Sequence, residues 1–102
     1  MSYSYVYFIT DDHGHIKIGK ADDVSERLLE LQTGNPFRLR VLLSVILASK
    51  RDAFSLESEL HKMFEDYRLE GEWFEAEPIL EMIDTDIVDT GSFKFGGLRY
   101  GK

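Results

Sequence analysis

The sequence predicts an α/β (α+β) sandwich in which a small, three-stranded, mainly antiparallel sheet is flanked by helices. Two observations predict this class: runs of alternating aromatic and β-branched residues, which are typical of strands, and segments with apolar residues at helical spacing. The expected order along the chain is β-β-α-β-α, followed by a short third helix. A length of 102 residues with 43% hydrophobic content fits one compact domain.

The first two strands are expected to form a β-hairpin. The run Tyr3–Thr10 is rich in aromatic and β-branched residues, and strand alternation puts Val6 and Phe8 on one face and Tyr7 on the other. Turn-forming residues follow, and the alternation resumes over Ile16–Gly19. The two runs therefore read as neighbouring antiparallel strands.

A first helix is predicted over Val24–Gln32. Asp23 precedes Glu26 by three residues, which is the spacing of a capping box, and a glycine and a proline follow the last apolar position. Arg27 borders the apolar stripe of this helix. We therefore expect its guanidinium to face a carboxylate or an anionic ligand.

The middle of the chain predicts the rest of the core. The nearly all-apolar run Val41–Ala48 indicates a central strand covered by helices. A second helix is expected to begin near Ser49 and continue to Phe64. A short third helix is expected over Pro78–Ile83, and residues 84–102 fit either a loose tail or an added strand.

Composition narrows the class of protein. The chain has no cysteine, so any ion must be bound by carboxylate or imidazole, which favours Mg²⁺ or Mn²⁺. No run approaches the ~20 apolar residues of a membrane span, and no signal-peptide pattern opens the chain, so we expect a cytoplasmic protein without a membrane partner. The net charge is −7, with seven Lys/Arg and six Asp/Glu in residues 1–51 but five and thirteen in residues 52–102. An anionic substrate is therefore expected to bind the first half.

The order of these elements, with an arginine in the first helix and a glutamate in the second, resembles the GIY-YIG endonuclease superfamily. The chain is most similar to the short phage and bacterial branch that reads KIG in place of YIG. The residues that carry the resemblance are Tyr5-Val6-Tyr7, Lys17-Ile18-Gly19, Arg27, Leu31–Pro36, Glu57–His61 and Gly71–Phe74. The resemblance implies a nuclease domain over residues 1–83.

The resemblance also implies the site residues of a metal-dependent DNA endonuclease. Glu57 would bind a single Mg²⁺ or Mn²⁺ ion, and Arg27 would contact the scissile phosphate. Tyr7 and Lys17 would position the attacking water or the phosphate. Lys17 stands where the family has a tyrosine, and a lysine acts as a base only if its pKa is lowered. His61, one turn after Glu57, would be a supporting partner, a phosphate donor or a general acid.

Two further cations, Lys20 and Arg68, are expected to bind the substrate. DNA is the expected partner, RNA is the other nucleic acid that fits, and a homodimer would be one way to cut both strands.

Each assignment has a structural alternative. Glu57 could be a surface carboxylate paired with His61 or Lys62, and Arg27 could form an ion pair at the edge of the core. Tyr7 could be a core aromatic and Lys17 a solvated strand residue. The rival function is a catalytically degenerate module of the same fold that binds nucleic acid or a host protein without cutting.

Overall fold

The computed structural model describes residues 3–87, 92–95 and 98–101. Its main sheet is antiparallel and has four strands, one more than the sequence predicted, in the order β3-β1-β2-β4. The strands are β1 (Ser4–Thr10), β2 (His15–Ala21), β3 (Arg40–Leu47) and β4 (Trp73–Glu75). The helices are α1 (Val24–Gln32), α2 (Lys50–Met63) and α3 (Ala76–Ile87), with a short 3₁₀ helix η1 (Glu65–Tyr67) after α2.

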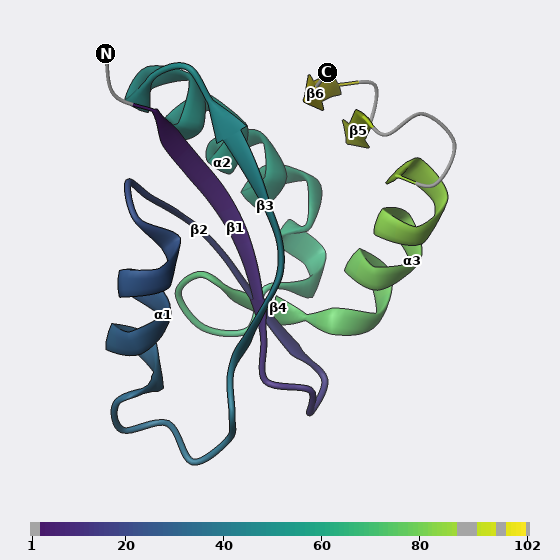
Figure 1. Cartoon of the computed structure of the whole chain (residues 1–102). Helices are drawn as coiled ribbons and strands as arrows, with labels where there is room; N and C mark the ends of the chain where they lie inside the picture. The colour runs from purple at the N-terminus through teal and green to yellow at the C-terminus, as the bar shows by residue number, and fades with distance from the viewer. Residues whose placement is uncertain (1–2, 88–91, 96–97, 102) are drawn as a thin grey trace.

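The sheet is covered on both faces, as predicted for a sandwich (Figure 1). Val6 and Phe8 of β1 pack in one core with apolar residues of α2 and α3, whereas Tyr7 and Ile9 pack in a second core with α1. The alternation predicted for the first strand is therefore confirmed. No helix among the described residues is long and apolar enough to cross a bilayer.

The prediction of a central strand over Val41–Ala48 is wrong. Among the described residues β3 pairs with β1 alone, so it is an edge strand, and Ile46 on it is 52% exposed. β1 is instead central, because β2 pairs with its other side. An apolar run reports burial of side chains and says little about which backbone edge is paired, which explains the error.

The fourth strand is the element that the sequence did not predict. The sequence Gly71-Glu72-Trp73-Phe74 reads as a turn followed by an aromatic lid, but Trp73–Glu75 pairs with His15–Lys17 of β2. A strand of three residues is too short to show a period of two. Because β4 is so short, residues 18–21 of β2 have no strand partner on this edge among the described residues, and this is where the candidate site lies.

The helices follow the sequence more closely. α1 has the predicted bounds, and Asp23 accepts a hydrogen bond from the backbone of Glu26 at 3.0 Å. Ser49 caps α2 in the same way, accepting from the backbone of Asp52 at 3.1 Å. α3 is longer than the predicted helix, because it begins before Pro78 and continues past Ile83.

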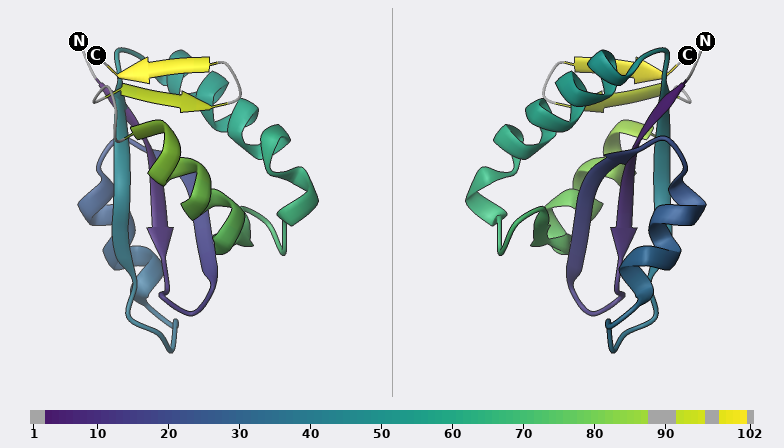
Figure 2. Two further views of the ribbon diagram at one scale, coloured as in Figure 1. Left: turned by 90° about the vertical axis from the view of Figure 1, so that its right-hand side faces the viewer. Right: turned by 90° about the vertical axis from the view of Figure 1, so that its left-hand side faces the viewer.

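The last part of the chain forms its own small sheet. β5 (Ser92–Phe95) and β6 (Leu98–Gly101) pair with each other and do not join the main sheet. β5 lies against α3 and β6 against β3, as Figure 2 shows for the yellow ribbon at the upper end of the molecule. The sequence left a tail and an added strand open, and the described residues form a separate two-stranded sheet.

Candidate active site at the open edge of the sheet

The candidate site begins where β4 stops pairing with β2. Beyond Lys17, the backbone of Ile18 is satisfied by two other segments: its N–H donates to the Glu72 carbonyl at 3.1 Å, and its carbonyl accepts from His61 Nε2 at 2.8 Å. The loop before β4 and helix α2 therefore meet at this edge. Glu72 and His61, which are far from β2 in the sequence, therefore lie beside this strand.

Gly19 allows the Tyr7 ring to cross the sheet toward this edge. The two residues are register partners on β1 and β2. A Cβ atom built on Gly19 would lie 2.4 Å from the Tyr7 hydroxyl oxygen, 2.7 Å from Cζ and 3.0 Å from Glu72 Oε1. No side chain fits in that space, so glycine is required here by close approach. Gly19 thus leaves room for the Tyr7 hydroxyl beside the Glu72 carboxylate.

The Tyr7 hydroxyl is buried and unpaired. The residue has 0% exposure, and its oxygen has no hydrogen-bond partner among the residues that the structure describes. Burial raises the pKa of Tyr7, while the nearby Arg27 guanidinium opposes this and the charges of Glu72 and Glu57 add to it. Arg27 is thus close, yet the two groups do not meet in ordinary hydrogen-bond geometry. A buried polar atom without a partner is uncommon and marks a place where a ligand or water can bind.

Arg27 reaches the site from α1. Its Nε donates to Glu30 at 3.0 Å and its Nη1 donates to the Lys20 carbonyl at 3.4 Å. Closeness to the Tyr7 hydroxyl raises the pKa of Arg27, burial opposes this, and Glu30 raises it further. The carboxylate that pairs with Arg27 is therefore Glu30, three residues on along the same helix. The guanidinium is held at two points, while the Arg27 side chain as a whole is about 39% exposed.

Three possible metal ligands lie together beside Tyr7. Glu57, His61 and Glu72 each offer an atom within 4.8 Å of the others. Glu57 is only 8% exposed, so it is not the surface carboxylate of the alternative interpretation, whereas Glu59 two residues on is exposed. Burial raises the pKa of Glu57, the charge of Glu72 raises it further, and His61 and Lys20 oppose this. The two carboxylates thus repel each other, and a divalent cation would relieve that repulsion.

The chemistry of these donors fits Mg²⁺ or Mn²⁺. Carboxylate oxygens are the ligands that such hard cations prefer, and imidazole is acceptable to Mn²⁺. His61 already donates its Nε2 hydrogen to the Ile18 carbonyl, so a neutral ring carries its lone pair on Nδ1. A backbone carbonyl that fixes the tautomer is a common arrangement behind a metal-binding histidine.

Lys17 also joins this group. Its side chain is only 14% exposed, its Nζ lies 3.3 Å from Glu72 Oε1, and it lies 5.8 Å from the centre of the Trp73 ring. It is therefore not the solvated strand lysine of the alternative interpretation. Its charge partly offsets the negative charge of the carboxylate pair.

The two residues predicted to bind the substrate are placed differently. Lys20 is exposed next to the site, and its charge lowers the pKa of Glu57. Arg68 donates to Glu65 at 3.2 Å and to the Gly71 carbonyl, and its guanidinium lies over the Phe74 ring at 5.0 Å. These contacts stabilise the loop that carries Glu72. Its role toward a substrate stays a prediction.

Sequence reasoning missed Glu72. The only signal for it was its place inside the short motif Gly71–Phe74, because no periodicity relates it to Glu57 fifteen residues earlier. Its proximity arises from pairing between β2 and β4, which the sequence did not predict.

Comparison with curated proteins and with solved structures finds no match for this chain. A model of one protein family, the T5orf172 domain, matches residues 2–89, which is most of the chain. The four-stranded sheet, the three helices and the grouped residues described above lie within these bounds, whereas β5 and β6 follow them. The chain therefore belongs to the T5orf172 domain family.

Proposed function

We propose that this protein is a metal-dependent endonuclease that hydrolyses phosphodiester bonds in DNA, using an ion bound by Glu57. The observation that carries the proposal is the convergence of Tyr7, Arg27, Glu57 and Glu72 from four segments on one place. The buried Tyr7 hydroxyl there has no hydrogen-bond partner among the residues that the structure describes. Membership of the T5orf172 family supports a role with nucleic acid, since this domain occurs in phage and bacterial nucleases, including some GIY-YIG-like proteins.

Glu57, Glu72 and His61 would hold a single Mg²⁺ or Mn²⁺ ion. When bound, such an ion would neutralise charge that develops on the phosphoryl oxygens. Burial and the charge of Glu72 raise the pKa of Glu57, so a metal ion would compete with a proton for this carboxylate.

The chain's own cations and phenol would handle the substrate. Arg27 would donate to the scissile phosphate, because its guanidinium is fixed by Glu30 and by the Lys20 carbonyl. Tyr7 would donate a hydrogen bond to the phosphate or to the attacking water. Its raised pKa keeps the phenol protonated at neutral pH, so it acts as a donor and not as a phenolate base.

A second function is favoured by one observation, the ion pair between Lys17 and Glu72. An ammonium 3.3 Å from one carboxylate occupies part of the place in which a cation would be expected. If Lys17 takes over the charge-balancing role of a metal, the domain would bind nucleic acid or a host protein without cutting. This is the catalytically degenerate module that the sequence left as the alternative.

The test is cleavage of labelled single- and double-stranded DNA, and of RNA, with Mg²⁺, Mn²⁺ or a chelator. Glu57→Gln should abolish metal-dependent cleavage, because it removes the buried ligand charge while keeping the side-chain volume. Glu59→Gln is the matched control, since it removes an exposed carboxylate two residues away on the same helix. Equal cleavage by both variants would refute the assignment of Glu57, and no cleavage by the wild type would favour the binding module.

A further inference from the structure

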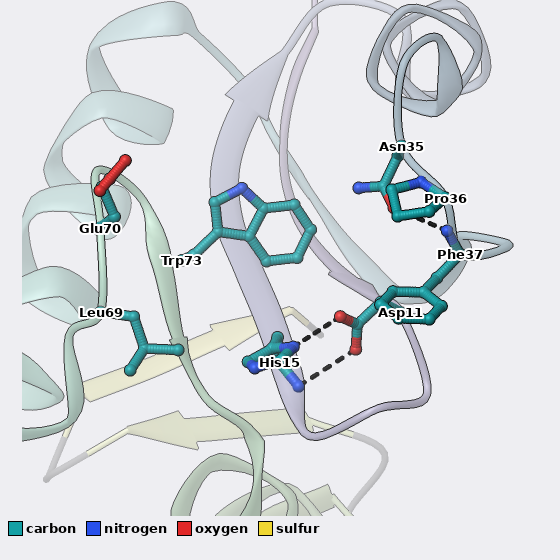
Figure 3. Close-up of a pocket in the computed structure, with 8 residues that line it drawn as sticks. All are labelled: Asp11, His15, Asn35, Pro36, Phe37, Leu69, Glu70 and Trp73. Carbon is teal, nitrogen blue, oxygen red and sulfur yellow. Dashed lines mark hydrogen bonds and ion pairs between the residues drawn. The ribbon is translucent and has the colours of Figure 1, made fainter.

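A cavity of about 300 Å³ lies beside the candidate site. Figure 3 shows the residues that line this cavity. Three segments form it: the β1–β2 turn, the loop after α1 and the loop before β4. Its apolar walls come from Trp73, Phe37, Pro36 and Leu69. A volume at the small end of ligand pockets, with aromatic walls, suits a small planar ring.

The aromatic walls are held in place before any ligand binds. Phe37 is 40% exposed, yet its ring stacks on His13 with centroids 3.9 Å apart. Its backbone N–H donates to Asn35 Oδ1 at 3.0 Å, and its carbonyl accepts from Gln32 Nε2 at 2.9 Å. Trp73 is fixed by the pairing of β4 with β2. Little ordering is therefore left to do when a ring enters the cavity.

The polar groups of the cavity can bind the edge of a heterocycle. Asn35 Oδ1 accepts from Phe37, which leaves the Asn35 amide hydrogens without a partner among the described residues, and Figure 3 shows this nitrogen on the side that faces Trp73. Asp11 Oδ2 lies 2.6 Å from His15 Nδ1, which leaves His15 Nε2 available. The Asn35 amide, as a donor, and the His15 Nε2 atom thus line the cavity together with the aromatic walls.

The negative charge of Asp11 is already satisfied. Burial alone would raise the pKa of Asp11, but hydrogen bonds from the His15 side chain and from the backbone of His13 and His15 lower it overall. The Trp73 ring already has the Lys17 ammonium near it. Glu70 also lines the cavity, but it is exposed to solvent, which screens its charge. A cationic ligand would therefore gain little from either carboxylate, which favours a neutral ring as the occupant.

The cavity is joined to the candidate site through two side chains. Trp73 lies 5.8 Å from the Lys17 Nζ atom, and Lys17 lies 3.3 Å from Glu72, which belongs to the cluster with Glu57. We propose that the cavity binds an unpaired nucleobase of the strand whose phosphate is held at that cluster. The inference rests on the proposed function and extends it, because it makes strands with unpaired bases the preferred substrate over fully paired duplex.

The first test is a binding measurement without cleavage. Trp73 is the only tryptophan in the chain and lines the cavity, so its fluorescence reports on the cavity and its immediate surroundings. Short single-stranded DNA added in chelator should quench it to saturation, and Phe37→Ala should weaken the apparent affinity by roughly tenfold, as expected for loss of one stacking surface. Phe54→Ala is the matched control, because Phe54 is also exposed and lies on α2 outside the cavity. Equal quenching by wild type and Phe37→Ala would overturn the inference.

A second test separates this inference from the proposed nuclease activity. The same DNA strand is prepared with one abasic sugar at each position in turn, and both quenching and metal-dependent cleavage are measured. Loss of quenching and slower cleavage at one or two positions would support the cavity. Unchanged cleavage and quenching by every abasic strand would overturn it while the nuclease proposal stands. Base-dependent quenching with no cleavage under any metal would keep the cavity and refute the nuclease.

Discussion

Removing the hydroxyl of Tyr7 should make the metal-free protein more stable. This oxygen is completely buried and has no partner among the described residues, so the folded state carries a desolvation cost that the unfolded state does not. Such a cost is about 1–3 kcal/mol for a hydroxyl in a protein interior. Tyr7→Phe removes it and leaves the ring packing in place. We expect an increase of about 1 kcal/mol or more in the free energy of unfolding.

The assay is urea unfolding of the metal-free protein, supported by thermal melts. A gain of 1 kcal/mol corresponds to a rise of about 4–8 °C in the melting temperature of a domain near this size. Tyr5→Phe is the control, because Tyr5 lies on the same face of β1 but is only half-buried. It should change the free energy of unfolding by less than about 0.5 kcal/mol. Cleavage by Tyr7→Phe should fall even as its stability rises.

A loss of stability in Tyr7→Phe would refute this reasoning. It would mean that Arg27 or a bound water satisfies the hydroxyl in solution, so that the group is structural. A gain in stability with unchanged cleavage would refute the catalytic role of the hydroxyl, since it would then be an unpaired atom that does not take part in cleavage. Only the combination of higher stability and lower cleavage supports an oxygen kept for a ligand at a cost to the fold.

Three further predictions concern the charges of the site. The pKa of Glu57 is raised above its ordinary 4.5, so its protonated form stabilises the fold at low pH, and that stability is lost as pH rises from 4.5 through the higher folded-state pKa. Over this pH range the metal-free wild type should therefore lose stability relative to Glu57→Gln. Melting temperatures measured as a function of pH would show this. Arg27→Ala should lower cleavage on the order of 10²-fold with little change in metal affinity, measured by single-turnover kinetics and Mn²⁺ titration. Lys17→Met should tighten Mn²⁺ binding on the order of tenfold by removing a competing cation 3.3 Å from Glu72, which calorimetry would detect, and weaker binding would contradict this.

Local sequence signals correctly predicted the features that depend on neighbouring residues alone, namely helix starts and the two faces of a strand. The caps at Asp23 and Ser49 gave correct starts for α1 and α2, and alternation gave the faces of β1. The errors concern pairing between distant segments. The run Val41–Ala48 is equally apolar whether its strand is central or at an edge, and β4 is too short to show a pattern.

The same distinction explains how much of the candidate site could be foreseen. Tyr7, Lys17, Arg27 and Glu57 were assigned from the family resemblance and are brought together by the fold. Glu72 could not be assigned, because its place depends on Ile18 pairing with the loop before β4. A residue whose position is set by one long-range backbone hydrogen bond leaves no periodic trace in the sequence.

The charges of the site imply that a metal should govern how tightly phosphate binds. Three cations, Lys17, Lys20 and Arg27, face three carboxylates, Glu30, Glu57 and Glu72, so these six side chains carry no net charge together. In a chain of net charge −7, a neutral site offers a phosphate little attraction, whereas one bound divalent ion would give it a charge of about +2. Stacking in the cavity beside Trp73 does not depend on that charge. The affinity for phosphate should therefore rise when metal is added and fall as the salt concentration increases. The contribution of base stacking to binding should stay nearly constant under both changes.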